Sequence, residues 1–123
     1  MTMKILIAED DEFLLKALDF KLSKDGYEVI KAKDGREVKQ ALEAGNIPDI
    51  IVTDIMMPYF TGLEVISYVR KNFQEKPIPI IALSAVGLEK TILEAFSMGA
   101  DDFITKPFSP NELLLRIKKL IPE

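Results

Sequence analysis

The sequence predicts an α/β protein with a doubly wound parallel sheet, and two observations lead to this prediction. Short apolar runs alternate five times with helix-length amphipathic segments, and such alternation is typical of βα units whose strands run parallel. Several of the runs are almost continuously apolar, as strands covered on both faces are. We therefore expect a three-layer sandwich with helices on both sides of the sheet. The 123 residues are expected to form a single domain, residues 1–123.

Five strands are expected at the apolar runs, namely Ile5–Ala8, Tyr27–Ala32, Ile50–Thr53, Ile80–Ser84 and Phe103–Thr105. The second run is diluted by Glu28 and Lys31 and the fifth is short, so both are expected at the edges of the sheet. Because crossovers between parallel strands are right-handed, the strand order 2-1-3-4-5 fits best. A sheet with this order opens a crevice between its first and third strands.

Helices are expected between and after the strands, where apolar residues recur at helical spacing. Three glycines, Gly26, Gly45 and Gly99, follow expected helices, where a left-handed residue ends a helix. Ser109 to Glu112 predicts a capping box with proline at the first helical position. The apolar positions that mark the helices are Leu14, Leu18 and Leu22; Val38, Ala41 and Leu42; Leu63, Ile66, Val69 and Phe73; Leu88, Ile92 and Phe96; and Leu113, Ile117, Leu120 and Ile121.

Composition excludes several classes of protein. The chain has no cysteine and no histidine, which excludes disulfides, thiolate sites, imidazole-ligated metals and a Ser-His-Asp triad. Any histidine that takes part in its chemistry must therefore belong to a partner. The net charge of -4 argues against direct nucleic-acid binding by this domain. Without a secretory signal or an apolar run of about 18–20 residues, no membrane association is expected and the protein is expected in the cytoplasm.

Five polar residues stand where expected strands end. Glu9 and Asp10 follow the first strand, Asp54 the third, Ser84 ends the fourth and Lys106 follows the fifth. In a parallel sheet all of these ends lie at the carboxyl edge, where open α/β sheets bind ligands. The sequence therefore predicts a functional site at this edge.

Carboxylates that converge at this edge are expected to bind a cation. Each like-charged pair about 4 Å apart costs on the order of 4 kcal/mol at an effective dielectric constant near 20, and a cation relieves this repulsion. Hard oxygen ligands without histidine or cysteine favour Mg²⁺, or Mn²⁺, at Asp10 and Asp54. Asp11 and Glu12 are instead assigned to the start of the first helix, with Asp11 as its cap.

A carboxylate beside Mg²⁺ can attack phosphorus and form an acyl phosphate, and Asp54 is the candidate for this role. Lys106 offers a positive charge and Ser84 a hydroxyl to the transferred phosphoryl group, where catalysis consists mainly of positioning and charge neutralisation. Two simpler interpretations remain open, a surface lysine at Lys106 and a helix cap at Ser84.

With these residues placed, the chain resembles the receiver domain of two-component response regulators over its whole length. The motifs are KILIAEDD, IIVTDIMMPYFTGLEVI, PIIALSA and GADDFITKPF, with steps of 30 residues from Asp54 to Ser84 and 22 from Ser84 to Lys106. The resemblance implies the flavodoxin-like (βα)5 fold. The last motif looks most like the receivers of winged-helix transcription factors.

The resemblance also implies roles for the site residues. Asp54 would take phosphate from the phosphohistidine of a histidine kinase or phosphotransfer protein. Asp10, Asp54 and the Met56 carbonyl would hold Mg²⁺, with Glu9 assisting directly or through water. Ser84 would contact the phosphoryl group and Lys106 would bridge phosphate and acid. The protein would act as a regulatory phosphoacceptor that catalyses its own phosphorylation and slow dephosphorylation, rather than as an enzyme.

Two further features follow from the resemblance. The Lys106–Pro107 peptide would be cis, although such bonds are trans in most cases. Phe103 would be the second switch element beside Ser84, lying inward when Ser84 is drawn to phosphate and partly exposed otherwise. It could equally be a plain core residue.

The last two helices and the strand between them would form the output face and pair two copies of the protein. Asp102 and Arg116 could form intermolecular salt bridges in such a dimer, or an exposed pair within one chain. Leu93 is a further candidate for this surface.

Met56 and Val86 lie two residues beyond site residues, where they would flank the path of an attacking water. Apolar side chains there cannot orient water, so slow self-dephosphorylation is expected.

Two functions of other classes fit the sequence less well. An aspartyl phosphatase would need a second acid where Met56 stands, and a flavin carrier would want a phosphate loop where EDDEF would repel phosphate. A protein-interaction module of the same fold that is never phosphorylated remains the alternative.

Overall fold

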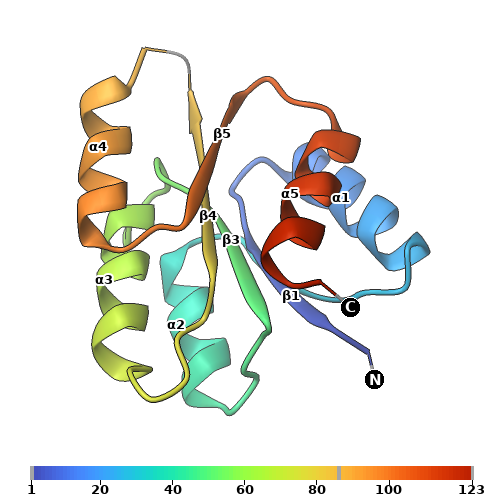
Figure 1. Ribbon diagram of the computed structural model, residues 1–123, viewed down its shortest axis with the longest axis horizontal. Coiled ribbons are helices and arrows are strands. Elements are labelled where there is room, and N and C mark those ends of the chain that lie inside the picture. The colour runs from blue at the N-terminus through green and yellow to red at the C-terminus, as the bar shows by residue number, and fades with distance from the viewer. Residues whose placement is uncertain (1, 86, 123) are drawn as a thin grey trace.

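The chain forms a five-stranded parallel sheet in the order β2-β1-β3-β4-β5, which confirms the predicted fold class and strand order (Figure 1). The computed structural model describes residues 2–85 and 87–122. The strands are β1 (Lys4–Ala8), β2 (Glu28–Ala32), β3 (Ile50–Asp54), β4 (Ile80–Ala85) and β5 (Asp102–Lys106). The helices are α1 (Glu12–Lys24), α2 (Gly35–Glu43), α3 (Gly62–Asn72), α4 (Glu89–Met98) and α5 (Pro110–Leu120).

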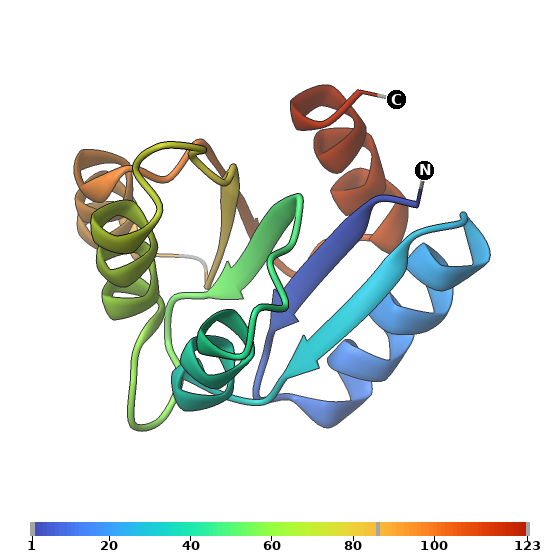
Figure 2. The ribbon, with the colours of Figure 1, turned by 90° about the horizontal axis from the view of Figure 1, so that it is seen from below.

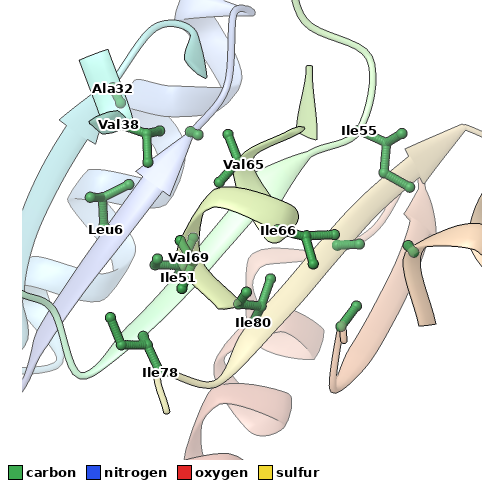
Figure 3. Packing of buried hydrophobic residues seen from close by; sticks show 14 of the residues in the cluster. Leu6, Ala32, Val38, Ile51, Ile55, Val65, Ile66, Val69, Ile78 and Ile80 are labelled. Carbon is green, nitrogen blue, oxygen red and sulfur yellow. The ribbon is translucent and has the colours of Figure 1, made fainter. Parts of the chain in front are cut away.

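Helices cover both faces of the sheet. Figures 1 and 2 show α1 and α5 on one face and α2, α3 and α4 on the other. Each face packs on its own hydrophobic cluster. Leu6, Ile51, Ile66, Val69 and Ile80 belong to the cluster beneath α2, α3 and α4 (Figure 3). The cluster on the opposite face is buried beneath α1 and α5 and includes Ile7, Leu18, Val52, Leu83 and Ile117.

Strand register determines where the functional edge lies. Ala8 pairs with Thr53, Asp54 with Leu83, and Ala85 with Lys106. The carboxyl ends of β1, β3, β4 and β5 are therefore nearly level, and residues that follow these strands meet at one edge of the sheet.

Side chains cap the starts of several helices. Asp11 caps α1 as expected, accepting hydrogen bonds from the N–H groups of Phe13 and Leu14. Ser109 caps α5 by accepting from the Glu112 N–H at 3.1 Å. A reciprocal capping box joins Thr61 and Glu64 at the start of α3, a position that the sequence analysis did not single out.

Helix α4 packs less deeply than its apolar spacing predicts. Leu88, Ile92 and Phe96 were expected to mark its inner face, yet Ala95 is the buried residue of this helix and Phe96 is 39% exposed. Phe96 instead lies edge-on to the ring of Phe103, with centroids 5.6 Å apart. Helical spacing of apolar residues does not identify the inner face of α4, because an apolar residue can also lie at the surface.

Within residues 2–85 and 87–122, no helix is both long and apolar enough to cross a bilayer.

Candidate functional site

Asp54 is the last residue of β3 and is buried, with 6% of its surface exposed. Its Oδ1 atom accepts a hydrogen bond from the Met56 N–H at 3.2 Å. The Thr53 hydroxyl donates to the Asp54 carbonyl oxygen at 3.0 Å. A Cβ atom at Gly62 would overlap that same carbonyl, so only glycine lets α3 begin so close to Asp54. Thr53 and Gly62 were not predicted as site residues, although the glycine within the FTGLEV segment was an available signal.

Lys106 reaches Asp54 from the end of β5. Its Nζ atom donates to Asp54 Oδ2 at 2.8 Å and to Glu9 Oε1 at 2.7 Å. Burial alone would lower the pKa of Lys106, but its hydrogen bonds to Asp54 and Glu9 outweigh burial and raise that pKa. The lysine is therefore charged and bridges two acids. The Lys106–Pro107 peptide is cis, the form that the resemblance implies.

Glu9 is the more deeply buried acid of the pair after β1, with 0% of its surface exposed. Its Oε2 atom accepts from the Asp11 N–H at 3.0 Å. Desolvation raises the pKa of Glu9 to about 7, although the hydrogen bond from Lys106 acts in the opposite direction. Glu9 is thus near half-protonated at neutral pH, and its charge depends on which cations stand beside it.

Asp10 completes an acidic cluster that could hold a metal. One carboxylate oxygen each from Glu9, Asp10 and Asp54 lie within 4.8 Å of one another. Asp10 is exposed, so the cluster opens to solvent on its side. Hard oxygen donors that leave positions for water fit a divalent ion such as Mg²⁺. Met56, whose carbonyl is the further candidate ligand, has a side chain on the surface, and the residue is 63% exposed.

Among the remaining predicted site residues, Ser84 lies near the carboxyl end of β4, at the same edge as the cluster. Asp102 begins β5 and therefore lies toward the opposite edge, together with its partner Arg116. Ser84 is fully buried, and its hydroxyl donates to the Ala85 carbonyl at 3.2 Å. Phe103 is partly buried against the core. Arg116 Nη1 donates to Asp102 Oδ1 at 2.9 Å and to the Phe103 carbonyl at 3.2 Å, so these two interface candidates form a pair within the chain. Val86, the second residue of the dephosphorylation hypothesis, lies outside the described residues.

A hollow of about 420 Å³ opens beside Lys106. It is lined by Asp11, Leu14, Lys106, Pro107 and Phe108. Its walls come from the start of α1 and the segment between β5 and α5, so a group that enters it approaches Lys106.

A parallel sheet with a buried aspartate, a bridging lysine and an acidic cluster at its carboxyl edge defines a class of signalling domain. Residues 5–118 match the family model of the response regulator receiver domain. The chain belongs to this family, as the motifs indicated.

Comparison with known proteins agrees with this assignment. The chain is 39% identical over 121 residues to the alkaline phosphatase synthesis transcriptional regulatory protein PhoP of Bacillus subtilis, covering 98% of this chain and 49% of PhoP. It is 42% identical over 120 residues to response regulator RR06 of Streptococcus pneumoniae, covering 97% of this chain and 53% of RR06. The chain thus spans about half the length of these curated relatives. The expected likeness to receivers of transcription regulators is confirmed.

A solved structure shows the same fold. The crystal structure of a putative response regulator from Chloroflexus aurantiacus superposes with a TM-score of 0.91 at 32% identity and covers 100% of both chains.

Proposed function

We propose that this domain is a phosphorylation-activated switch in which Asp54 accepts a phosphoryl group from the phosphohistidine of a histidine kinase or phosphotransfer protein. The observation that supports this most is the Lys106 ammonium, which lies 2.8 Å from Asp54 Oδ2 beside the acidic cluster. A buried carboxylate between an ammonium and a site for a divalent cation is suited to receive a group with negative oxygens.

The step is a simple group transfer. One carboxylate oxygen of Asp54 forms a bond to phosphorus while the bond from phosphorus to the imidazole nitrogen of the donor breaks. The nitrogen leaves with the electron pair of that bond, and a proton on the other nitrogen of the donor ring makes the leaving group neutral imidazole. The product is an acyl phosphate on Asp54.

Residues of the chain itself hold and neutralise the transferred group. Lys106 is close enough to Asp54 to pair with a phosphoryl oxygen attached there. Ser84 would need to release the Ala85 carbonyl before its hydroxyl could donate to another oxygen. The hollow beside Lys106 gives the donor a route of approach.

Mg²⁺, or Mn²⁺, would be held by Asp10, Asp54 and the Met56 carbonyl, with Glu9 as direct or water-mediated support. When bound, such an ion supplies positive charge that offsets both the carboxylates and the phosphoryl oxygens.

Phosphorylation adds about -1.5 to -2 charges to Asp54 and would bias a two-state element. We assign this element to Ser84 and Phe103, whose ring lies against Phe96 on α4. A change there would alter the face formed by α4, β5 and α5, and through it an output partner, an output domain or a second copy of the protein. The domain is then a regulator and not an enzyme that acts on other molecules.

Phosphoryl transfer is tested by incubating the chain with acetyl phosphate and Mg²⁺ and measuring its intact mass. We expect a mass increase of one phosphoryl group that Asp54→Asn abolishes and that a chelator prevents. Asp49→Asn, which alters an acid at the opposite end of β3, is the matched control. Wild-type protein that stays unmodified under these conditions would favour the interaction module that is never phosphorylated.

A further inference from the structure

Tyr59, in the segment between β3 and α3, has a backbone conformation that bulky residues avoid. Its φ is 67°, and among residues 2–85 and 87–122 it is the one non-glycine residue with a positive φ. The left-handed region crowds the Cβ atom of an L-residue and is costly for a large side chain. Tyr59 is 73% exposed, so burial of its ring does not offset that cost.

A cation on α2 stacks on the Tyr59 ring. The guanidinium carbon of Arg36 lies 3.7 Å from the ring centroid, well within the range of a cation–π contact. Arg36 is itself oriented, because its Nη2 atom lies 3.2 Å from Asp34 Oδ2. Asp34 in turn caps α2 by accepting from the N–H groups of Arg36 and Glu37 at 2.8 and 3.1 Å. The start of α2 thus presents a fixed cation to Tyr59.

The next residue also fastens this segment to α2. Phe60 lies against Gly35, where an added Cβ atom would overlap both the Phe60 carbonyl and its ring. The Phe60 ring is edge-on to Tyr68 with centroids 6.4 Å apart. Figure 2 shows the segment between β3 and α3 beside the first turn of α2. Tyr59 and Phe60 therefore both anchor the segment between β3 and α3 to the start of α2.

The other end of the same segment is fixed at the site. Met56 donates its N–H to Asp54 at 3.2 Å, and the Gly62 N–H donates to the Ile55 carbonyl at 2.9 Å. Met56 and Tyr59 are three residues apart. Because so few bonds separate the two residues, a change of backbone conformation at Tyr59 is expected to shift the backbone of Met56.

We propose that Tyr59, held by Arg36, is a positioning residue for the cation and phosphoryl chemistry at Asp54. The stacking contact stabilises a strained backbone that would otherwise relax, and so fixes the Met56 peptide whose carbonyl is assigned to the ion. This inference rests on the proposed function. In this role Tyr59 acts through the backbone and is not assigned as a ligand of the ion or of the phosphoryl group.

The test measures Mg²⁺ affinity by isothermal titration calorimetry and the initial rate of Asp54 phosphorylation by acetyl phosphate. We expect Arg36→Gln and Tyr59→Ala each to raise the Mg²⁺ Kd about threefold to fivefold, in line with an exposed cation–π contact. Tyr59→Phe retains the ring and should bind Mg²⁺ like wild type. Lys39→Gln is the matched control, because it removes a cation from the same helix, 5.5 Å from the Tyr68 ring.

A double variant separates positioning from a general effect on α2. If Arg36 acts through Tyr59, Arg36→Gln in the Tyr59→Ala background should weaken Mg²⁺ binding no further. Urea unfolding of each variant reports whether the fold is intact. Additive losses, or Mg²⁺ binding by Tyr59→Ala equal to that of wild type, would overturn the inference while leaving the proposed function standing. Wild type that neither binds Mg²⁺ nor is phosphorylated would overturn both.

Discussion

Glu9 shows how one buried side chain sets the pH response of the site. Its pKa is raised from 4.5 to about 7 by desolvation, so between these values the folded protein holds a proton that the unfolded chain has released. The unfolded state then binds fewer protons than the native state, and the contribution of Glu9 to stability decreases as the pH rises from about 4.5 to about 7.

Glu9→Gln should therefore flatten this part of the stability profile. In chelator at pH 8, the variant is expected to be more stable than wild type by about 1–3 kcal/mol, since one pKa unit corresponds to about 1.4 kcal/mol. The difference should vanish near pH 4. Urea unfolding across this pH range measures it, with Glu12→Gln on the exposed start of α1 as the control. If the stability of wild type and of Glu9→Gln depended on pH in the same way, the raised pKa of Glu9 would be contradicted.

Met56 is a second residue whose chemistry predicts behaviour. Its exposed thioether beside Asp54 can neither orient nor polarise a water molecule. Met56→Asn adds an amide that can hydrogen-bond water, so phosphate loss from Asp54 should become several-fold faster. The decay of phosphorylated protein after removal of the donor measures the rate, with Met98→Asn on α4 as the control. An unchanged half-life would show that water access is limited elsewhere.

At the scale of elements, Arg70 joins the end of α3 to α4 and the sheet. Its guanidinium donates to the Gly99 carbonyl at 2.7 Å, to the Ile78 carbonyl at 2.7 Å and to Asp101 at 2.9 Å. Gly99 has a φ of 116° and ends α4, and an added Cβ there would crowd Arg70. One side chain thus secures the carboxyl end of α4.

Arg70→Ala is expected to cost about 2 kcal/mol of unfolding free energy, because it leaves partly buried carbonyls without their donor. Chemical denaturation in urea gives this value, with Lys71→Ala, an exposed neighbour, as the control. Equal midpoints for the two variants would mean that water replaces the guanidinium without loss.

The surface of α4, β5 and α5 carries the predicted dimer contacts. Leu93, the predicted apolar candidate, is 69% exposed, and Leu115 on α5, which was not predicted, is 68% exposed. The Asp102–Arg116 pair joins β5 to α5. Arg116→Glu should reduce dimerisation in the presence of a phosphate mimic, because it places like charges at the expected contact. Sedimentation velocity at several concentrations tests this, with Lys118→Glu as a control of equal charge change. Dimerisation that both variants weaken equally would indicate a net-charge effect instead.

Elements were predictable where one physical signal dominates. The predicted runs Ile50–Thr53 and Ile80–Ser84 are mostly apolar because the strands that contain them are covered on both faces. The positions and order of these strands therefore follow from the sequence. The depth of α4 was not predictable, because Phe96 has the spacing of an inward residue and lies partly at the surface.

Some residues of the candidate site could likewise be predicted from the sequence and others could not. Asp54, Asp10 and Lys106 could be placed at one edge because each ends or closely follows a parallel strand. Two features could not be foreseen. One is that Glu9 is the acid buried against Lys106, which depends on side-chain direction at the strand end. The other is the stacking of Arg36 on Tyr59, which joins residues of different elements and has no local pattern.

At the scale of the whole molecule, one sheet joins two cores. Leu6 and Ile51 face the cluster beneath α2, α3 and α4, while Ile7 and Val52, the next residues on the same strands, face the cluster beneath α1 and α5. Because side chains alternate along a strand, neither cluster can lose its packing without disturbing strands that the other needs. The two clusters should therefore unfold together.

Conservative truncations on opposite faces of the sheet test this coupling. Ile66 on α3 and Ile117 on α5 are fully buried in different clusters. Replacing either one by valine is expected to lower the free energy of unfolding by about 0.5–1.5 kcal/mol. Since the sites share no contact cluster, the double variant should lose the sum of the two within about 0.5 kcal/mol. All three proteins should unfold in a single urea transition that fluorescence and circular dichroism report alike. A second transition in either single variant would mean that one helical layer can separate while the other remains folded, and the edge that carries Asp54 would then lie on a sheet supported from one side only.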